Sequence, residues 1–173
     1  MKNNYVDITT NDLQKIFKNI RWNNPISVTL TLKKSVFHNG VWEKIDRIKV
    51  DRNTTHFFNR LNKKIYKNSF RRYGKKIRSF VTVGGDGDWV NYHLHMCLEK
   101  PNHVSYEQFC NLISECNSKT TFGNDSKDIQ PMYSDGWITY MMEQRTKTYN
   151  TPDTIEMFSS SVDWLNSNFE QLN

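Results

Sequence analysis

The chain has 173 residues, which is enough for one domain with a substantial core and short for two. It has no apolar run of about eighteen residues and no apolar stretch typical of a secretory signal, so we expect neither a membrane span nor secretion. Three cysteines without a CxxC pair fit reduced thiols in a cytoplasmic protein, and the net charge of +6 favours a polyanionic partner.

The first part of the chain predicts an arm followed by two strands. We expect residues 1–24 to form an arm with one short helix, Asp12 to Asn19. Residues 26–32 alternate strictly between apolar side chains and Ser or Thr, which is typical of a strand with one buried face. Residues 42–50 follow an Asn39-Gly40 turn and predict a second strand that pairs with the first as a hairpin.

The middle of the chain predicts a helix and two further strands. From Thr54 to Tyr73 the apolar residues recur at helical spacing, and Gly74 ends the pattern. Residues 77–84 predict the third strand. Residues 89–99 predict the fourth, which Pro101 ends.

The last part predicts two helices around a fifth strand. Ser105 to Gln108 form a capping box for an amphipathic helix, and residues 128–133 predict the strand. Asp135 can cap a helix from Gly136 to about Lys147, and we expect residues 150–173 to form a last helix or tail. The order β-β-α-β-β-α-β-α predicts an α+β fold, in which a central, mostly antiparallel five-stranded sheet has its helices on one face. One domain over 1–173, with its core at about 26–147, accounts for the chain.

One stretch carries positive charge without acidic neighbours. Between Arg60 and Arg78 lie nine Lys and Arg residues and no Asp or Glu. A solvated helix face is the plain interpretation, but this density favours a surface that faces phosphates. We expect phosphate contacts from most of this run and from one lysine further along the chain: Lys63, Lys64, Lys67, Arg71, Arg72, Lys75, Lys76 and Lys147.

The predicted fourth strand places two histidines on one face. His93 and His95 alternate with Val90, Tyr92, Leu94, Met96 and Leu98, which we expect to face the core. Two imidazoles two residues apart on a rigid strand can share one divalent ion. Two surface histidines without a ligand are the alternative.

The predicted helix over residues 136–147 carries Tyr140 one turn before Gln144 and beside Glu143. Most tyrosines in such positions pack against the fold and make one hydrogen bond at the tip. The helix alone therefore indicates no chemistry.

Together these segments resemble the HUH endonucleases, the family of rolling-circle replication initiators, relaxases and single-tyrosine transposases. The string Tyr92-His93-Leu94-His95-Met96-Cys97-Leu98 resembles the family's His-hydrophobic-His motif. Residues 27–31 are similar to the first motif of replication initiators, and residues 137–140 are similar to the motif that carries the nucleophile. The three motifs follow the family order over residues 26–147, which implies the ferredoxin-like (RRM-like) HUH nuclease fold.

The resemblance implies a divalent ion, Mn²⁺ or Mg²⁺, held by His93, His95 and a third side chain. It implies that Tyr140 attacks a phosphate of single-stranded DNA and leaves a 3′-hydroxyl and a 5′-phosphotyrosine. The expected function is DNA nicking that initiates rolling-circle replication of a phage, virus or plasmid. We expect a separate helicase as a partner, because the chain has no G-x-x-x-x-G-K-[ST] motif.

One position departs from the replication initiators, which usually carry a lysine three or four residues after the tyrosine. Here those positions are Glu143 and Gln144, and the nearest lysine is Lys147. Single-tyrosine HUH transposases use a glutamine one turn after the tyrosine as the third metal ligand. The resemblance therefore implies Gln144 as that ligand, with Glu143 as the alternative and Asp86 and Asp88 behind them, and a transposase remains the alternative function.

A non-catalytic nucleic-acid-binding module is the alternative of another class. Such modules stack bases on aromatic side chains of an exposed sheet face. Trp42 and Trp89 fit base stacking and core packing equally well, whereas Tyr92 belongs to the expected core face. The face expected to carry Ser27, Thr29, Thr31 and the two histidines suits a metal site better than base stacking.

Overall fold

The computed structural model describes residues 20–85 and 90–147, with side chains described through residue 141. The expected helix at 12–19, the C-terminal tail, Trp89, Asp86 and Asp88 lie outside these ranges. The main sheet has the strand order β4-β5-β1-β6, and all its pairs are antiparallel. Its strands are β1 (Pro25–Leu32), β4 (Ser79–Gly84), β5 (His93–Glu99) and β6 (Gly123–Pro131).

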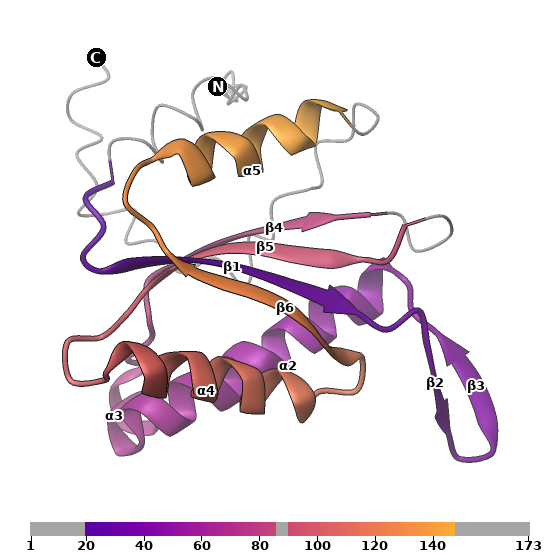
Figure 1. Ribbon diagram of the computed structural model, residues 1–173. Coiled ribbons are helices and arrows are strands. Elements are labelled where there is room, and N and C mark those ends of the chain that lie inside the picture. The colour runs from indigo at the N-terminus through magenta and orange to yellow at the C-terminus, as the bar shows by residue number, and fades with distance from the viewer. Residues whose placement is uncertain (1–19, 86–89, 148–173) are drawn as a thin grey trace, which may run out of the picture.

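Helices cover both faces of this sheet (Figure 1). Helices α2 (Arg47–Tyr66), α3 (Asn68–Tyr73) and α4 (Tyr106–Ser118) lie on one side, and α5 (Gly136–Lys147) lies on the other. The α+β class and the antiparallel sheet are thus confirmed, whereas the expectation of helices on one face is wrong. Among the described helices, none combines the length and the apolar content needed to cross a bilayer.

The expected five-stranded sheet is wrong in the region that follows β1. Strands β2 (Ser35–His38) and β3 (Val41–Lys44) pair only with each other and form a separate hairpin. Its turn residues Asn39 and Gly40 both have positive φ, of 49° and 79°, as a two-residue hairpin turn requires. The main sheet therefore has four strands in the described part of the chain.

The segment after β3 is a helix, although the predicted second strand extends over residues 42–50. The carboxylate of Asp46 accepts a hydrogen bond from the backbone N of Lys49 at 2.8 Å, so α2 begins at Arg47. The predicted helix from Thr54 to Tyr73 is divided at Lys67, which has a φ of 48°. Gly74 ends α3 in the left-handed region, as the sequence predicts. The capping box at Ser105 is also confirmed.

Two apolar clusters of unequal size lie on the two faces of the sheet. The larger one fills the space between the sheet and the helices α2 and α4, and includes Val28, Leu94, Met96, Phe57 and Phe109. The smaller one holds α5 against β4 and β5, and its buried members are Phe80, Cys97, Ile138 and Met141. Phe80 and Cys97 give the second face an apolar patch, and this patch explains why a helix covers it.

Candidate metal and nucleophile site

Strand β5 carries the two histidines of the predicted motif. Leu94, Met96 and Leu98 belong to the large core, as their alternation predicts, and His93 and His95 face the opposite side. The strand begins at His93 rather than at residue 89, and Val90, expected in the core, is 54% exposed. The two imidazole rings lie edge to face with their centroids 4.7 Å apart. The structure therefore brings the two rings into direct contact at the start of a central strand.

His93 is fixed from two sides. Its Nδ1 lies 3.0 Å from the backbone carbonyl oxygen of Asn91, and a carbonyl can only accept, so Nδ1 carries the proton. This tautomer leaves the lone pair on Nε2, the nitrogen that a metal would use. The ring lies over Gly84 of β4, which pairs with His93 in the sheet. A Cβ at residue 84 would lie 2.3 Å from Nε2, so only glycine leaves room for the imidazole.

His95 is buried and remains uncharged. In the neighbouring strand β1, Thr29 pairs with His95. The Oγ1 of Thr29 lies 3.1 Å from the Nδ1 of His95. Burial, and to a smaller extent the neighbouring His93, lower the pKa of His95 to about 4. When Thr29 accepts the proton of Nδ1, Nε2 keeps its lone pair. The strand that resembles the first family motif thus supplies a side chain that orients a candidate ligand.

Helix α5 places Tyr140 beside His95. Its Ile138 and Met141 are buried in the small apolar cluster, which fixes how the helix lies on the sheet. The rings of Trp137 and Tyr140 are stacked with centroids 5.2 Å apart, and each meets the ring of His95, at 5.4 Å and 5.5 Å respectively. Trp137 Nε1 also donates to the carbonyl oxygen of Met96 at 3.0 Å. Tyr140 remains 39% exposed, so its ring lies beside the imidazole of His95 and part of the side chain can still be reached from solvent.

The third metal ligand expected from the sequence lies outside the described part. The backbone of Glu143 and Gln144 belongs to α5, one turn beyond Tyr140, but their side chains are not described, and the same holds for Lys147. Within the described residues, no group of three His, Cys, Asp or Glu side chains could hold a metal. The described portion of the site is therefore a histidine pair with a tyrosine.

The basic run lies far from this site. Lys63, Lys64 and Lys67 are at the end of α2, and the rest of the run follows on α3 and the segment after it, on the face of the sheet opposite α5 (Figure 1). Arg78 O accepts from the backbone N of Glu99, which places the end of the run beside the last residue of β5. Six residues separate Glu99 from His93, or about 20 Å along a strand. The run and the histidines thus lie at opposite ends of β5.

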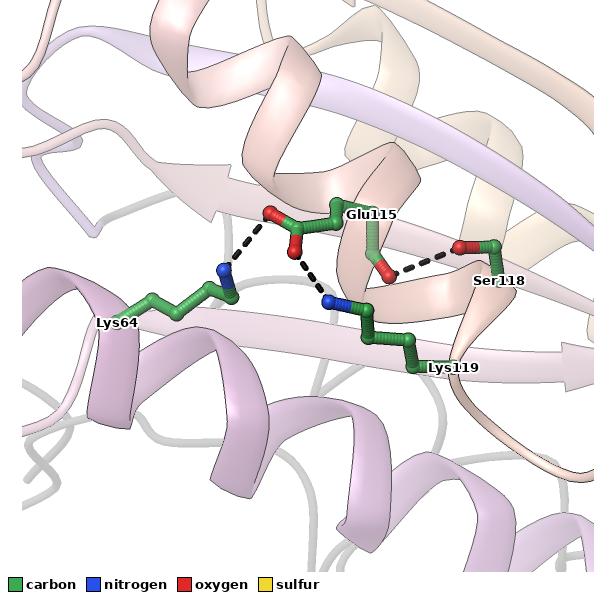
Figure 2. Close-up of polar contacts among 4 residues, drawn as sticks. All are labelled: Lys64, Glu115, Ser118 and Lys119. Atoms are coloured by element: carbon green, nitrogen blue, oxygen red, sulfur yellow. Dashed lines mark hydrogen bonds and ion pairs between the residues drawn. The ribbon is translucent and has the colours of Figure 1, made fainter.

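Part of the basic run is engaged within the fold. Lys64 Nζ lies 2.7 Å from a carboxylate oxygen of Glu115 on α4, and Glu115 also pairs with Lys119 (Figure 2). These two cations lower the pKa of Glu115 to about 2, and Glu115 in turn raises the pKa of Lys64. Lys75 Nζ lies 5.0 Å from the centroid of the Tyr66 ring. At least two members of the run therefore have partners on the protein itself.

Three residues around the site were not predicted as functional. Gly84 and Asn91 hold His93, and Trp137 supports Tyr140. Trp137 precedes Tyr140 by three residues, a spacing that places two side chains on one helix face. Comparison of the chain with protein-family models, with curated proteins and with solved structures found no match.

Proposed function

We propose that this chain is a metal-dependent enzyme that nicks and rejoins single-stranded DNA through Tyr140. One observation carries the proposal: residues of α5 and β5 that are 45 positions apart in the sequence bring the Tyr140 ring to 5.5 Å from the ring of His95, which itself touches His93. A partly exposed tyrosine beside two imidazoles with oriented nitrogens is the arrangement that covalent phosphoryl transfer needs.

The two histidines fit a divalent ion. Both are held through Nδ1, by Asn91 O and by Thr29 Oγ1, which leaves Nε2 as the ligand atom. His95 is neutral at pH 7 because burial lowers its pKa to about 4, and a neutral imidazole is the form that binds a metal. Imidazole ligands favour Mn²⁺ over Mg²⁺. When bound, such an ion supplies a positive charge that stabilises the developing charge on a phosphate oxygen.

In the covalent step, the proton that the tyrosine loses passes to solvent, and solvent supplies the proton that the leaving oxygen takes up. The Tyr140 phenol gives up its proton, and its oxygen forms a bond to phosphorus. The bond between phosphorus and the 3′ oxygen breaks, and that oxygen takes up a proton and leaves as a hydroxyl. The 5′-phosphate stays on Tyr140, so one phosphodiester replaces another and a later 3′-hydroxyl can reverse the step. Trp137 stacks on the tyrosine ring and restricts its movement. A hydrogen bond from Trp137 Nε1 to Met96 O holds the indole itself in place.

We propose single-stranded DNA as the substrate because His95 is only 6% exposed. An unpaired strand can bend and bring one phosphate to a recessed imidazole, whereas a duplex holds its phosphates on a stiff helix. The biological setting that we propose is the initiation of rolling-circle replication, with a helicase as a separate partner. Transposition uses the same chemistry and is the alternative, which the helical spacing of Tyr140 and Gln144 supports.

The test is the capture of a covalent protein–DNA adduct. The protein is incubated with a pool of single-stranded oligonucleotides and Mn²⁺, denatured, and separated on a gel. We expect an adduct that maps to Tyr140 by mass spectrometry, and a released fragment that ends in a 3′-hydroxyl. Tyr140→Phe is expected to lower the adduct yield by roughly 10⁴-fold or more, as loss of a nucleophile does.

Tyr133→Phe is the matched control, because Tyr133 is 92% exposed and lies on the segment just before α5. It should leave the adduct unchanged. An adduct that persists in Tyr140→Phe and maps to another tyrosine would show that Tyr140 is not the nucleophile. Binding without any adduct, in every metal and strand tested, would favour a non-catalytic binding module.

A further inference from the structure

The β2–β3 hairpin exposes aromatic side chains that the main fold does not use. It forms its own two-stranded sheet and projects from one end of the molecule (Figure 1). Phe37 is 62% exposed, Trp42 is 69% exposed, and their ring centroids lie 5.5 Å apart. A hydrophobic pair exposed to this degree on a small separate hairpin indicates a surface with a binding role.

One face of the hairpin combines aromatic rings with a positive charge. Phe37 pairs with Trp42 and Ser35 pairs with Lys44, and alternation along each strand places these four side chains on the same face. Aromatic rings beside a cation and a hydroxyl are suited to bases and a phosphate backbone. Five Lys or Arg residues and two acidic residues lie between residues 33 and 49, which gives this region a net charge of +3. This charge favours a polyanion over an uncharged apolar partner.

The base of the hairpin adjoins the histidine pair. Thr31, near the end of β1, pairs with His93, and the next residue, Leu32, donates its backbone N–H to Tyr92 O at 2.8 Å. The exposed Lys33 and Lys34 then lead into β2, and Ile45 N donates to Lys34 O and closes the base of the hairpin. A strand of DNA that leaves the histidines at this end of β5 therefore meets two lysines and then the hairpin.

An open groove lies beside the hairpin. It has a volume of about 700 Å³, and its lining includes Trp42, Glu43 and Lys44 of the hairpin, Lys49 of α2, and Tyr92. Lys49 lies 3.4 Å from a carboxylate oxygen of Glu43, so its charge is engaged within the fold. Trp42 lines this groove, so the aromatic face of the hairpin has a concave surface beside it.

We infer that the β2–β3 hairpin is a base-stacking arm that holds the DNA strand next to the phosphate attacked by Tyr140. This inference rests on the proposed function, because its occupant is a flanking part of the same strand. Bases stack on Phe37 and Trp42, and the backbone passes Lys33, Lys34 and Lys44. Stacking accepts any base, so the arm contributes affinity and placement rather than sequence readout.

The test measures binding of a fluorescein-labelled oligodeoxythymidine by anisotropy at fixed salt. Trp42→Ala and Phe37→Ala should each raise the Kd by about tenfold, and together by about a hundredfold. Trp42→Phe keeps an aromatic ring and should stay within about threefold, whereas Trp42→Leu keeps apolar bulk without a ring and should behave like Trp42→Ala. Tyr133→Ala is the matched control, because Tyr133 is 92% exposed and lies outside both the hairpin and the basic run. Circular dichroism and melting temperature verify that each variant is folded.

The adduct assay, run in parallel, separates this inference from the proposed function. If the wild type forms the adduct and the Phe37 and Trp42 variants keep the wild-type Kd, the stacking arm is wrong and the nicking activity stands. If no strand forms an adduct but the variants lose binding as expected, the arm stands and the nicking activity is wrong. Equal losses in Tyr133→Ala, or a self-association that Trp42→Ala removes without changing the Kd, would also overturn the stacking arm.

Discussion

The two faces of the main sheet differ in how much of their surface is apolar. Toward α2 and α4, the side chains of β1 and β5 are continuously apolar, and Val28, Leu30, Leu94 and Met96 are at most 1% exposed. Toward α5, the buried apolar side chains are few, and Thr29, His93 and His95 lie beside them. The second face can hold polar side chains because the first one stabilises the sheet.

A buried imidazole is nevertheless costly unless it is hydrogen-bonded. His95 meets this condition through Thr29, and the rings of Trp137 and Tyr140 pack edge to face against its imidazole. The face toward α5 thus gives up some stability to hold a neutral, oriented histidine. Substitutions on the two faces should separate stability from metal binding.

The largest expected contrast is between His95→Ala and Leu94→Ala, adjacent residues on opposite faces of β5. His95→Ala and His93→Ala should each abolish Mn²⁺ binding in titration calorimetry and, with it, the adduct. Leu94→Ala should lower the free energy of unfolding by about 2–5 kcal/mol and keep the metal affinity. His95→Ala should cost about 1–3 kcal/mol because it leaves a space under α5, whereas the less buried His93 should cost under about 1 kcal/mol. Normal adduct formation in either histidine variant would contradict the two-histidine site.

Acid should destabilise the metal-free protein through the face toward α5. The pKa of His95 is about 4 in the folded protein and about 6.5 in the unfolded chain, so the unfolded state binds the proton more readily. The stability that this histidine contributes is complete above about pH 6.5 and is lost as the pH falls toward 4, by up to about 3 kcal/mol. Urea unfolding in the presence of a chelator, at neutral pH and near pH 4, measures the loss. A His95→Gln variant should lack this part of the pH dependence, and an identical profile in both proteins would contradict the assignment.

Gly84→Ala sharpens the contrast because it acts on the site through a neighbouring strand. The added Cβ would lie 2.3 Å from His93 Nε2 and must displace the ring from its place over β4. We expect Mn²⁺ affinity to fall by about 10–100-fold, as when a residue that orients a ligand is changed. The melting temperature should change little, since the ring of His93 can turn toward solvent. In the double variant with His93→Ala the clash is absent, so its stability should equal that of His93→Ala alone; an additive loss would mean that Gly84 acts elsewhere.

The sequence predicts the strands β1 and β5, the capping box at Ser105 and the extent of α5, because each has a clear period or a local hydrogen bond that ends it. It fails at residues 45–50, which the predicted strand over 42–50 includes. Asp46 caps a helix there, so only the first residues of that prediction lie in a strand, β3. The turn at Asn39 and Gly40 was recognised, but it joins β3 to β2 rather than to β1.

For the site, the sequence predicts which residues share a face but not what covers that face. The alternation of β5 places His93 and His95 together, yet nothing in it indicates that α5 buries His95. The fit of Gly84 beneath the His93 ring depends on the register between β4 and β5, which the chain order does not specify. The sequence also does not show how far the basic run lies from the histidines. The run is close to β5 along the chain, but the fold places its last residue, Arg78, beside the end of β5 that is far from the histidines.

The smallest effect that we expect concerns this basic run. Lys63 and Lys67 are exposed, whereas Lys64 pairs with Glu115 and connects α2 to α4, so Lys64 should stay unchanged in the test (Figure 2). Reversing Lys63 and Lys67 to Glu should weaken binding of all single strands alike and reduce the salt slope by about 0.7 for each phosphate contact that is lost. The rate of adduct formation at saturating DNA should not change, because these lysines lie at the end of α2, on the face of the sheet opposite α5 (Figure 1). Lys127→Glu, an equal charge reversal at an exposed position of β6, is the control and should leave the slope as it is. An unchanged slope for Lys63 and Lys67 would assign the run to the solvated surface and leave the hairpin end of the sheet as the principal DNA contact.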